Sequence, residues 1–248
     1  MITLAGQTIV VIGGSSGIGY AVAESSLQSL ASHVIIASSS LDRVNAAVSR
    51  LESAAKSAGV SGKVSGRVLN VKDSAQIKSF FDEVGEIDHL VFSSGDALTL
   101  SGLKDLDLDS IRGVYDVRLW APTICAQQAK IKKSGSIVLT TGSVVKKPSQ
   151  GWSIVAGIAG SVDSLTRGLA VDLAPIRVNC IAPGFVNTEM WDTTPKDVLE
   201  KIFAEQSEKL LVKHVASPEE VAEAYLFAMK CAFITGETLH VNGGQTLV

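Results

Sequence analysis

Short apolar runs alternate with longer segments of helical periodicity along the whole chain. The short runs are rich in Val and Ile, and most carry apolar residues at both odd and even positions. A strand with this pattern is covered on both faces, which is typical of a parallel sheet between two layers of helices. Seven segments are therefore predicted as strands: Thr8–Gly14, His33–Ser38, Gly66–Val71, His89–Ser94, Gly135–Gly142, Ile176–Pro183 and Thr238–Gly243.

The segments between these runs carry the start and stop signals of helices. Residues Leu41–Gly59 repeat apolar positions at helical spacing and end at a glycine, while Ser217–Lys230 opens with Ser, Pro and two Glu. The regular alternation predicts a single domain, residues 1–248, of α/β class. Its expected architecture is Rossmann-like: a doubly wound parallel sheet of about seven strands with helices on both faces.

One segment departs from the alternation. Residues 184–217 follow a predicted strand and contain aromatic and apolar residues without a further strand. Ligands of such sheets bind outside the carboxyl ends of the strands, so this segment is predicted to be a substrate lid. An ordinary pair of surface helices is the alternative.

Composition narrows the class of protein. The chain has 248 residues, 46% of them hydrophobic, and a net charge of −3 without blocks of like charge. These values favour one large core and a small-molecule partner, and indicate neither a nucleic-acid surface nor a membrane patch. No charged leader or long apolar segment precedes the first strand, so we expect a cytoplasmic protein. Cys125, Cys180 and Cys231 lack metal-ligand or redox spacing and are expected to be free, buried thiols, with no metal site.

A glycine-rich turn follows the first predicted strand and opens a helix. Gly13, Gly17 and Gly19 permit a tight turn, a close approach of the backbone to a pyrophosphate, and close packing of helix on strand. The helix N-terminus adds amide donors and a partial positive charge. The turn is predicted to bind a dinucleotide, with Ser15, Ser16 and Ile18 as its remaining contacts.

The spacing of these glycines resembles the short-chain dehydrogenase/reductase family. Four motifs occur in the family's order: "GGSSGIG" from Gly13, "TGS" from Thr141, "RVNCIAPG" from Arg177 and "ITGETLHVNGG" from Ile234. The resemblance covers nearly the whole chain. It implies an oxidoreductase with a nicotinamide cofactor, and we expect a homo-oligomer, either a dimer or a tetramer.

The end of the second predicted strand indicates which nicotinamide cofactor is used. An acid there would bind the ribose hydroxyls of NAD, but the chain has Ser38, Ser39 and Ser40, then Arg43, with Asp42 as the first carboxylate. Hydroxyl donors and a guanidinium suit a 2′-phosphate, so NADPH/NADP+ is predicted. The alternative places Arg43 on a solvated helix face, since the family's usual basic residue directly after the strand is missing.

The resemblance implies further contacts to the cofactor. Asn70 and Val71 would lie near the adenine, and Ser94 and Gly95 replace part of the family's "NNAG" segment. The loop that holds the nicotinamide end in the family corresponds to Pro183, Gly184, Val186 and Thr188.

The family's catalytic set is Asn, Ser, Tyr and Lys. Its tyrosine exchanges a proton with the substrate oxygen, its lysine lowers the tyrosine pKa and holds the ribose, its serine hydrogen-bonds the oxygen, and its asparagine holds a water. Counting along the motifs, only Ser143 remains. The tyrosine, lysine and asparagine positions correspond to Val155, Ala159 and Arg118.

Few residues offer a replacement. None of the tyrosines lies in the helix after Ser143; Tyr115, one helical turn before Arg118, either approaches the site or is a core or subunit-contact aromatic. Asp96 and Arg118 are placed near the nicotinamide by the resemblance, and together with Ser143 they are the predicted catalytic residues; a structural ion pair is the alternative. The predicted substrate contacts are Trp152, Val155, Met190 and Trp191.

The missing acid restricts the reaction. General acid catalysis contributes roughly 10²–10⁴-fold, about 3–5 kcal/mol, so an ordinary ketone would be reduced slowly. Hydride addition to an iminium ion gives a neutral amine without any acid. We therefore predict an NADPH-dependent reductase acting on an activated C=N or conjugated substrate in secondary-metabolite biosynthesis, with a role in cyclisation. The alternatives are a non-redox cyclase or isomerase with NADP(H) as a platform, a non-catalytic NADP(H)-binding protein, and a carbonyl reductase with an unrecognised acid.

Overall fold

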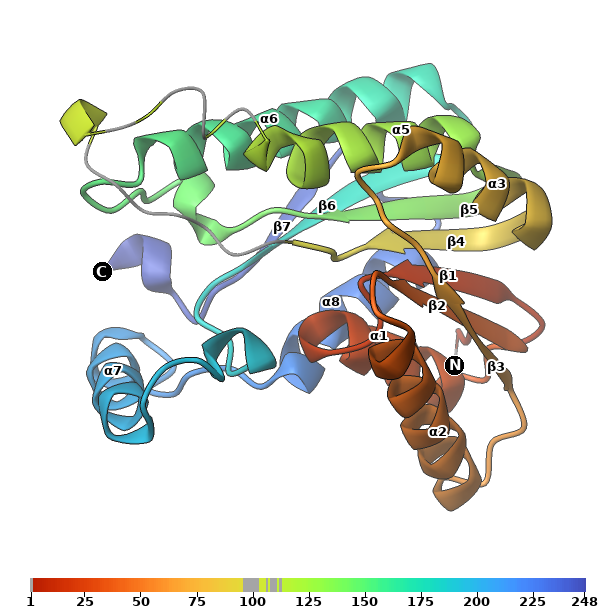
Figure 1. Cartoon of the computed structure of the whole chain (residues 1–248), viewed down its shortest axis with the longest axis horizontal. Helices are drawn as coiled ribbons and strands as arrows, with labels where there is room; N and C mark the ends of the chain where they lie inside the picture. Colours follow the sequence, from red (N-terminus) through yellow and green to blue (C-terminus); the bar gives the residue numbers. More distant parts are fainter. Residues whose placement is uncertain (1, 96–102, 106, 108–110, 112) are drawn as a thin grey trace.

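Within the described residues, seven strands form one parallel sheet in the order β3-β2-β1-β4-β5-β6-β7. The computed structural model describes residues 2–95, 103–105, 107, 111 and 113–248. The strands, shown in Figure 1, are β1 (Thr8–Ile12), β2 (His33–Ser38), β3 (Lys63–Val68), β4 (Glu86–Phe92), β5 (Lys130–Thr140), β6 (Arg177–Pro183) and β7 (Thr238–Val241). The predicted Rossmann-like fold is confirmed.

Helices cover both faces of the sheet, so each face has its own apolar core (Figure 1). One layer contains α1 (Gly17–Gln28), α2 (Leu41–Ser57) and α8 (Pro218–Lys230). The other contains α3 (Ser74–Val84), α5 (Ala121–Gln128) and α6 (Ser153–Asp172). The strands supply alternate residues to the two cores, which explains why their sequences are apolar at both odd and even positions.

The order of the strands positions the site. β1 pairs with β2 on one side and with β4 on the other, so the direction of winding reverses there. A crevice forms outside the carboxyl ends of the strands at such a reversal, and dinucleotides bind in it. These ends lie on the left in Figure 1, together with the C-terminal turn and α7 (Lys196–Lys209).

The predicted bounds of the third strand were wrong. The strand begins at Lys63 and ends at Val68, whereas the sequence favoured Gly66–Val71. β3 is an edge strand that pairs only with β2, and most of its side chains are exposed or half-buried. It therefore lacks the continuous apolar run that marks the central strands.

Both helix-end signals work as predicted. Gly59 follows α2 with φ of +69°, a left-handed conformation that glycine adopts without strain. At α8, Ser217 forms a capping box with Glu220: the Glu220 N–H donates to Ser217 Oγ at 3.4 Å and the Ser217 N–H donates to Glu220 Oε2 at 2.8 Å.

Short helical turns connect the main elements. They are η1 (Leu103–Asp105), η3 (Ser143–Val145), η4 (Glu189–Trp191) and η5 (Gln245–Leu247), which are 3₁₀ turns, and η2 (Asp116–Trp120), which is π-helical. π-helical turns are rare and occur often at functional sites. In this chain η2 leads directly into α5.

α6 is the one helix among the described residues that is long and apolar enough, by length and composition, to cross a membrane. Its inward-facing residues, including Ile158 and Val162, are buried, and the helix packs against β6 and β5. The apolar residues of α6 therefore belong in part to the hydrophobic core.

The free thiols agree with the sequence prediction except for one. Cys125 and Cys180 are buried, and burial raises the pKa of each to about 12, so both are inert at neutral pH. Cys231 is only half-buried, because it comes directly after the last residue of α8 and does not lie on a helix face that packs against the sheet.

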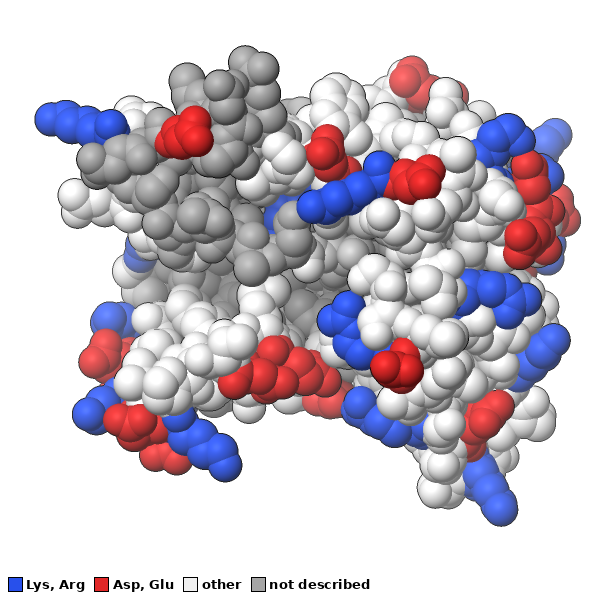
Figure 2. Space-filling view, viewed as in Figure 1, with Lys and Arg blue, Asp and Glu red and all other residues white. Residues whose placement is uncertain are grey.

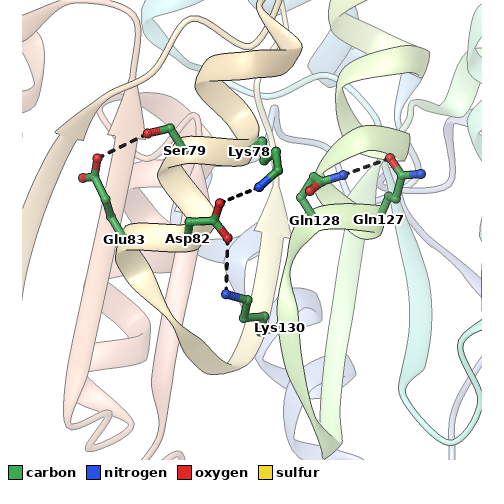
Figure 3. A network of polar contacts seen from close by, with 7 residues as sticks. All are labelled: Lys78, Ser79, Asp82, Glu83, Gln127, Gln128 and Lys130. Carbon is green, nitrogen blue, oxygen red and sulfur yellow. Dashed lines mark hydrogen bonds and ion pairs between the residues drawn. The ribbon is translucent and has the colours of Figure 1, made fainter.

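Surface charges are mixed. Figure 2 shows acidic and basic side chains interspersed on the described part of the face in view. A small network at the amino ends of β4 and β5 is drawn in Figure 3: Asp82 of α3 accepts from Lys78 at 2.6 Å and from Lys130 at 3.3 Å. Exposed pairs of this kind contribute little to stability because solvent screens them, and this network lies at the opposite edge of the sheet from the carboxyl ends of the strands.

Candidate active site

The glycine-rich turn is closely packed. A Cβ atom added at Gly13, whose φ is +90°, would lie 2.6 Å from the backbone nitrogen of Ser94, and one at Gly19 would overlap the Gly13 carbonyl oxygen. The N-cap residue Ser16 makes no side-chain hydrogen bond to α1. The turn is therefore narrow and leaves backbone amides at the helix N-terminus for an anion, as a cofactor diphosphate requires.

The segment predicted as a lid, residues 184–217, touches this turn. A Cβ atom at Gly17 would lie 3.3 Å from the side chain of Thr188, and the Gly17 N–H donates a hydrogen bond to the carboxylate of Glu189. Thr188 also caps η4 by accepting a hydrogen bond from the Met190 N–H at 3.4 Å. The structure thus brings a predicted nicotinamide-end residue to the phosphate turn and adds Glu189, which the sequence did not indicate.

The serine run after β2 is held beside a guanidinium. Arg43 Nη2 donates to Ser39 Oγ at 3.2 Å, and Ser40 caps α2 by accepting from the Arg43 N–H at 3.4 Å. Ser38 is the last residue of β2 and pairs through its carbonyl with the Leu69 N–H. Hydroxyl groups and one positive charge therefore gather at the end of β2, an arrangement that fits a 2′-phosphate.

Asn70 shapes the loop after β3. Its side-chain oxygen accepts from the Lys72 N–H at 3.1 Å, and its carbonyl accepts from the Asp73 N–H at 3.0 Å. Asp73 in turn caps α3, and hydrogen bonds from Gln76 and Ala75 lower the pKa of its carboxyl group. This fixed turn holds Val71 at the carboxyl edge of the sheet.

Arg118 lies at the carboxyl end of β4. It belongs to the π-helical turn η2, and a Cβ atom at Gly95 would lie 3.0–3.2 Å from the atoms of its guanidinium group. η2 also packs against α6. A fixed positive charge therefore stands beside a predicted cofactor-binding residue, while Asp96 lies outside the described residues.

Ser143 is buried at the start of η3, with an exposed fraction of 6%. Its hydroxyl donates a hydrogen bond to Gln245 Oε1 at 3.0 Å. Gln245 opens the C-terminal turn η5 and also contacts Gly184, in the loop after β6. The structure therefore unites Ser143 with the predicted nicotinamide-end loop through a residue that the sequence did not indicate.

The α6 positions that the family resemblance assigns to tyrosine and lysine are apolar and buried. Val155 and Ala159 are each 8% exposed, and α6 contains neither tyrosine nor lysine. Thr141 Oγ1 donates to the Ala159 carbonyl at 2.8 Å, which ties this turn of the helix to the end of β5. No proton donor stands at either position.

Two of the three tyrosines, Tyr20 and Tyr225, belong to helices on the other face of the sheet from α6, and the third, Tyr115, faces α6. Tyr225 is fully buried in the core, where its hydroxyl pairs with Thr140 and burial raises its pKa. The guanidinium carbon of Arg50 lies over the Tyr20 ring, 4.1 Å from the ring centroid. The Tyr115 hydroxyl would lie 3.9 Å from a Cβ atom at Gly157, so it faces α6.

The histidines make contacts within the sheet or at the surface. His33 pairs with Ser65 at 2.8 Å across β2 and β3, and His89 is buried between Ser136 and Gln7. His214 contacts an exposed glutamate, and His240 lies on β7. Among the described residues, no group of three His, Cys, Asp or Glu side chains has the arrangement of a metal site.

The lid has its own aromatic cluster. Trp191 stacks on Phe185 with ring centroids 5.7 Å apart, and Phe203 of α7 meets it edge to face at 5.9 Å. The Trp191 indole N–H also donates to the Val186 carbonyl at 3.0 Å. α7 contains no buried residue, and Phe203 joins it to this cluster.

The other predicted substrate contacts differ in burial. Met190 is 67% exposed on η4, whereas Trp152 is half-buried directly before α6. Val155 follows Trp152 on the buried face of that helix.

Comparison with known proteins identifies the family. Residues 2–248 match the family model described as an SDR-like Rossmann domain. The chain is 37% identical to the short-chain dehydrogenase/reductase fsr5 of Gibberella fujikuroi over 256 residues, which cover 98% of this chain and 96% of that protein. The chain therefore belongs to the short-chain dehydrogenase/reductase family and is an oxidoreductase of that family.

Two solved structures are informative. The MalC reductase/Diels-Alderase of Malbranchea aurantiaca superposes with a TM-score of 0.92 at 32% identity, covering 99% of this chain and 98% of that chain. A small-chain dehydrogenase in complex with NADPH superposes with a TM-score of 0.80 at 25% identity, covering 98% of this chain and 99% of that chain.

Proposed function

We propose that the protein is an NADP(H)-dependent reductase that delivers hydride to an activated C=N or conjugated bond of a biosynthetic intermediate. NADP(H) is the cofactor, and it supplies the hydride. The glycine-rich turn would hold its diphosphate, and Ser39 with Arg43 would hold its 2′-phosphate. The chain's own residues then orient the substrate and exclude water.

The observation that carries this proposal is the apolar face of α6. Val155 and Ala159 are buried there, so the two positions that the family resemblance assigns to tyrosine and lysine carry no proton donor. Reduction of a ketone without an acid loses roughly 10²–10⁴-fold in rate. An iminium ion needs no acid, because hydride addition moves its π-electron pair onto nitrogen and leaves a neutral amine.

Arg118 is proposed to anchor the substrate. Its guanidinium lies against Gly95 and keeps its proton near neutral pH, so it acts as a fixed charge and not as an acid. Such a charge would oppose an adjacent iminium but favour a carbonyl or carboxylate elsewhere on the same molecule. Asp96 and Ser143 complete the proposed catalytic set.

The substrate is proposed to lie between the start of α6 and the lid, residues 184–217. Trp152, Val155 and Met190 would contact it directly. Trp191 would contribute through its cluster with Phe185, which holds the lid in shape. The proposal also includes a homo-oligomeric, cytoplasmic protein, which size-exclusion chromatography and cell fractionation would test.

A second function has a specific observation behind it. The superposed MalC structure is described as a reductase and Diels-Alderase, so the same fold combines reduction with ring closure in that protein. A site whose α6 positions Val155 and Ala159 are apolar suits a cyclisation that proceeds without net redox change. In that case the cofactor would shape the crevice without being consumed.

NADPH oxidation with defined probes tests the proposal. The protein should oxidise NADPH with protonated 3,4-dihydroisoquinoline, a cyclic iminium, and at least tenfold more slowly with the ketone 1-tetralone. Faster reduction of the ketone would refute the proposal. Comparison of metabolites in strains with and without the gene would then identify the natural substrate, and product formation without NADPH consumption would favour cyclisation.

A further inference from the structure

The C-terminal turn reaches the buried serine through a single hydrogen bond. Ser143 Oγ donates to Gln245 Oε1 at 3.0 Å, across 102 residues of sequence. Ser143 follows β5, and Gln245 is the first residue of η5. Both lie at the carboxyl edge of the sheet, beside the loop after β6.

Packing holds the Gln245 side chain where it is. A Cβ atom at Gly184 would lie 2.8 Å from Gln245 Oε1, so the loop after β6 touches the amide directly. The Gln245 N–H donates to the Asn242 carbonyl at 2.9 Å. Gly244, with φ of +81°, packs against the side chain of Leu211 at the end of the lid. The turn is therefore fixed on both sides of the amide.

The direction of this hydrogen bond decides what Ser143 can offer. A hydroxyl group has one proton to donate and two lone pairs with which to accept. Since Gln245 Oε1 takes the proton, the serine oxygen can offer a substrate only its lone pairs. A carbonyl substrate needs a donor at this place, whereas a protonated nitrogen needs an acceptor.

We propose that Gln245 is a positioning residue that makes Ser143 a hydrogen-bond acceptor, so that the site selects a substrate whose reacting nitrogen carries a proton. This inference rests on the proposed function and narrows its substrate class to N–H iminium ions. To serve a ketone, Ser143 would have to turn its proton away from Gln245, and Oε1 would lose its partner beside Gly184.

Ligand binding tests the assignment without any turnover. The probes are protonated 1,2,3,4-tetrahydroisoquinoline, an ammonium ion, and 1-tetralone, a ketone of similar size. Calorimetry with the NADP+-loaded protein should give tighter binding of the ammonium ion. Gln245→Met, of similar length but without an acceptor oxygen, should reduce this preference at least tenfold. Gln245→Glu retains an acceptor and should keep or increase the preference.

A double-variant cycle separates positioning from a structural effect. In a Ser143→Ala background, Gln245→Met should change the preference by less than twofold, because its partner is gone. Thr246→Val removes a side-chain contact of the same turn, the hydrogen bond from Asn242 Nδ2 at 3.4 Å, and should leave the preference unchanged. Thermal melts of all variants report whether the turn still folds.

The outcomes distinguish this inference from the proposed function. An unchanged preference in Gln245→Met, its loss in Gln245→Glu, or absence of any ammonium preference in the unchanged protein overturns the role of Gln245. If the preference behaves as stated but 3,4-dihydroisoquinoline is not reduced, the proposed function fails and the role of Gln245 stands.

Discussion

The backbone N–H of Gly17 donates a hydrogen bond to Glu189 Oε2 at 2.7 Å. Gly17 opens α1 in the glycine-rich turn, and Glu189 opens η4 in the lid segment. The carboxylate therefore engages one of the amides that a diphosphate needs, and it puts a negative charge beside that position. Binding of a cofactor diphosphate to this amide would therefore compete with Glu189.

Glu189→Gln should consequently bind NADPH about three- to tenfold more tightly, a gain of about 1 kcal/mol, because the amide is uncharged and accepts more weakly. Fluorescence titration of NADPH measures the change. Glu205→Gln removes an exposed lid carboxylate on α7 and should have no effect. Weaker binding by Glu189→Gln would mean that the carboxylate supports the cofactor.

Cofactor choice should depend on Arg43. The protein is expected to bind NADPH at least tenfold more tightly than NADH, and Arg43→Ala should remove most of that difference, since the guanidinium stands beside Ser39. Parallel titrations of both cofactors decide this. Arg50→Ala removes a positive charge from the same helix and should preserve the difference. Equal affinities in the unchanged protein would refute the 2′-phosphate site.

Restoring the family's residues should not restore the family's activity. The double variant Val155→Tyr with Ala159→Lys should gain at most a trace of ketone reduction, because Arg118 would still stand at the position that the family resemblance assigns to the asparagine. The larger side chains must also displace buried packing, at a cost of about 1–3 kcal/mol. Assays with 1-tetralone and thermal melts give the two readouts. Robust ketone reduction would show that the rest of the site functions as in family members that have the full catalytic set.

Arg118→Ala should separate catalysis from folding. The variant is expected to fold and bind NADPH nearly normally but to lose turnover roughly tenfold or more, about 1.4 kcal/mol, because the substrate loses its anchor. Melts, cofactor titration and product assays are measured together. Unchanged turnover would remove Arg118 from the site, and a collapsed melt would assign it to the fold.

His89 should make stability fall in mild acid. Burial, with a contribution from Arg177, lowers the pKa of its imidazole to about 4, against an ordinary value of 6.5. Between these values the unfolded chain binds the extra proton, so stability decreases as the pH falls. The expected loss between pH 7 and pH 5 is about 2 kcal/mol.

Urea denaturation at the two pH values measures this loss. His89→Asn cannot titrate and keeps a polar group near Ser136, which lies 2.8 Å from His89 Nδ1. Between pH 7 and pH 5, the free energy of unfolding of His89→Asn should therefore fall by about 2 kcal/mol less than that of the unchanged protein. An equal loss in both proteins would contradict the assignment to His89.

The sheet was predictable because its signals are local. Apolar runs marked the buried strands, the Gly59 and Ser217 signals marked helix ends, and the glycine spacing marked the close-packed turn at the start of α1. β3 was misplaced because an edge strand does not need apolar residues. Each of these results depends on a few neighbouring residues.

The contacts that define the site join distant parts of the chain. Ser143 and Gln245 are 102 residues apart, and Gly17 and Glu189 are 172 apart. Neither Gln245 nor Glu189 has a local pattern that distinguishes it from a surface residue. The position of Gln245 directly after a family motif, Asn242 to Gly244, was the one available hint.

The aromatic cluster of the lid also has an optical consequence. Trp191 is stacked on Phe185 and touched by Phe203, while its indole N–H is bound to a carbonyl. The fluorescence of an indole ring responds to solvent and to its hydrogen bonds, so any rearrangement of this cluster changes the emission wavelength and the emission intensity of Trp191. With Trp120 and Trp152 replaced by phenylalanine, Trp191 would be the remaining emitter. A stopped-flow instrument could then record a rearrangement of residues 184–217 on addition of NADPH, without an attached dye.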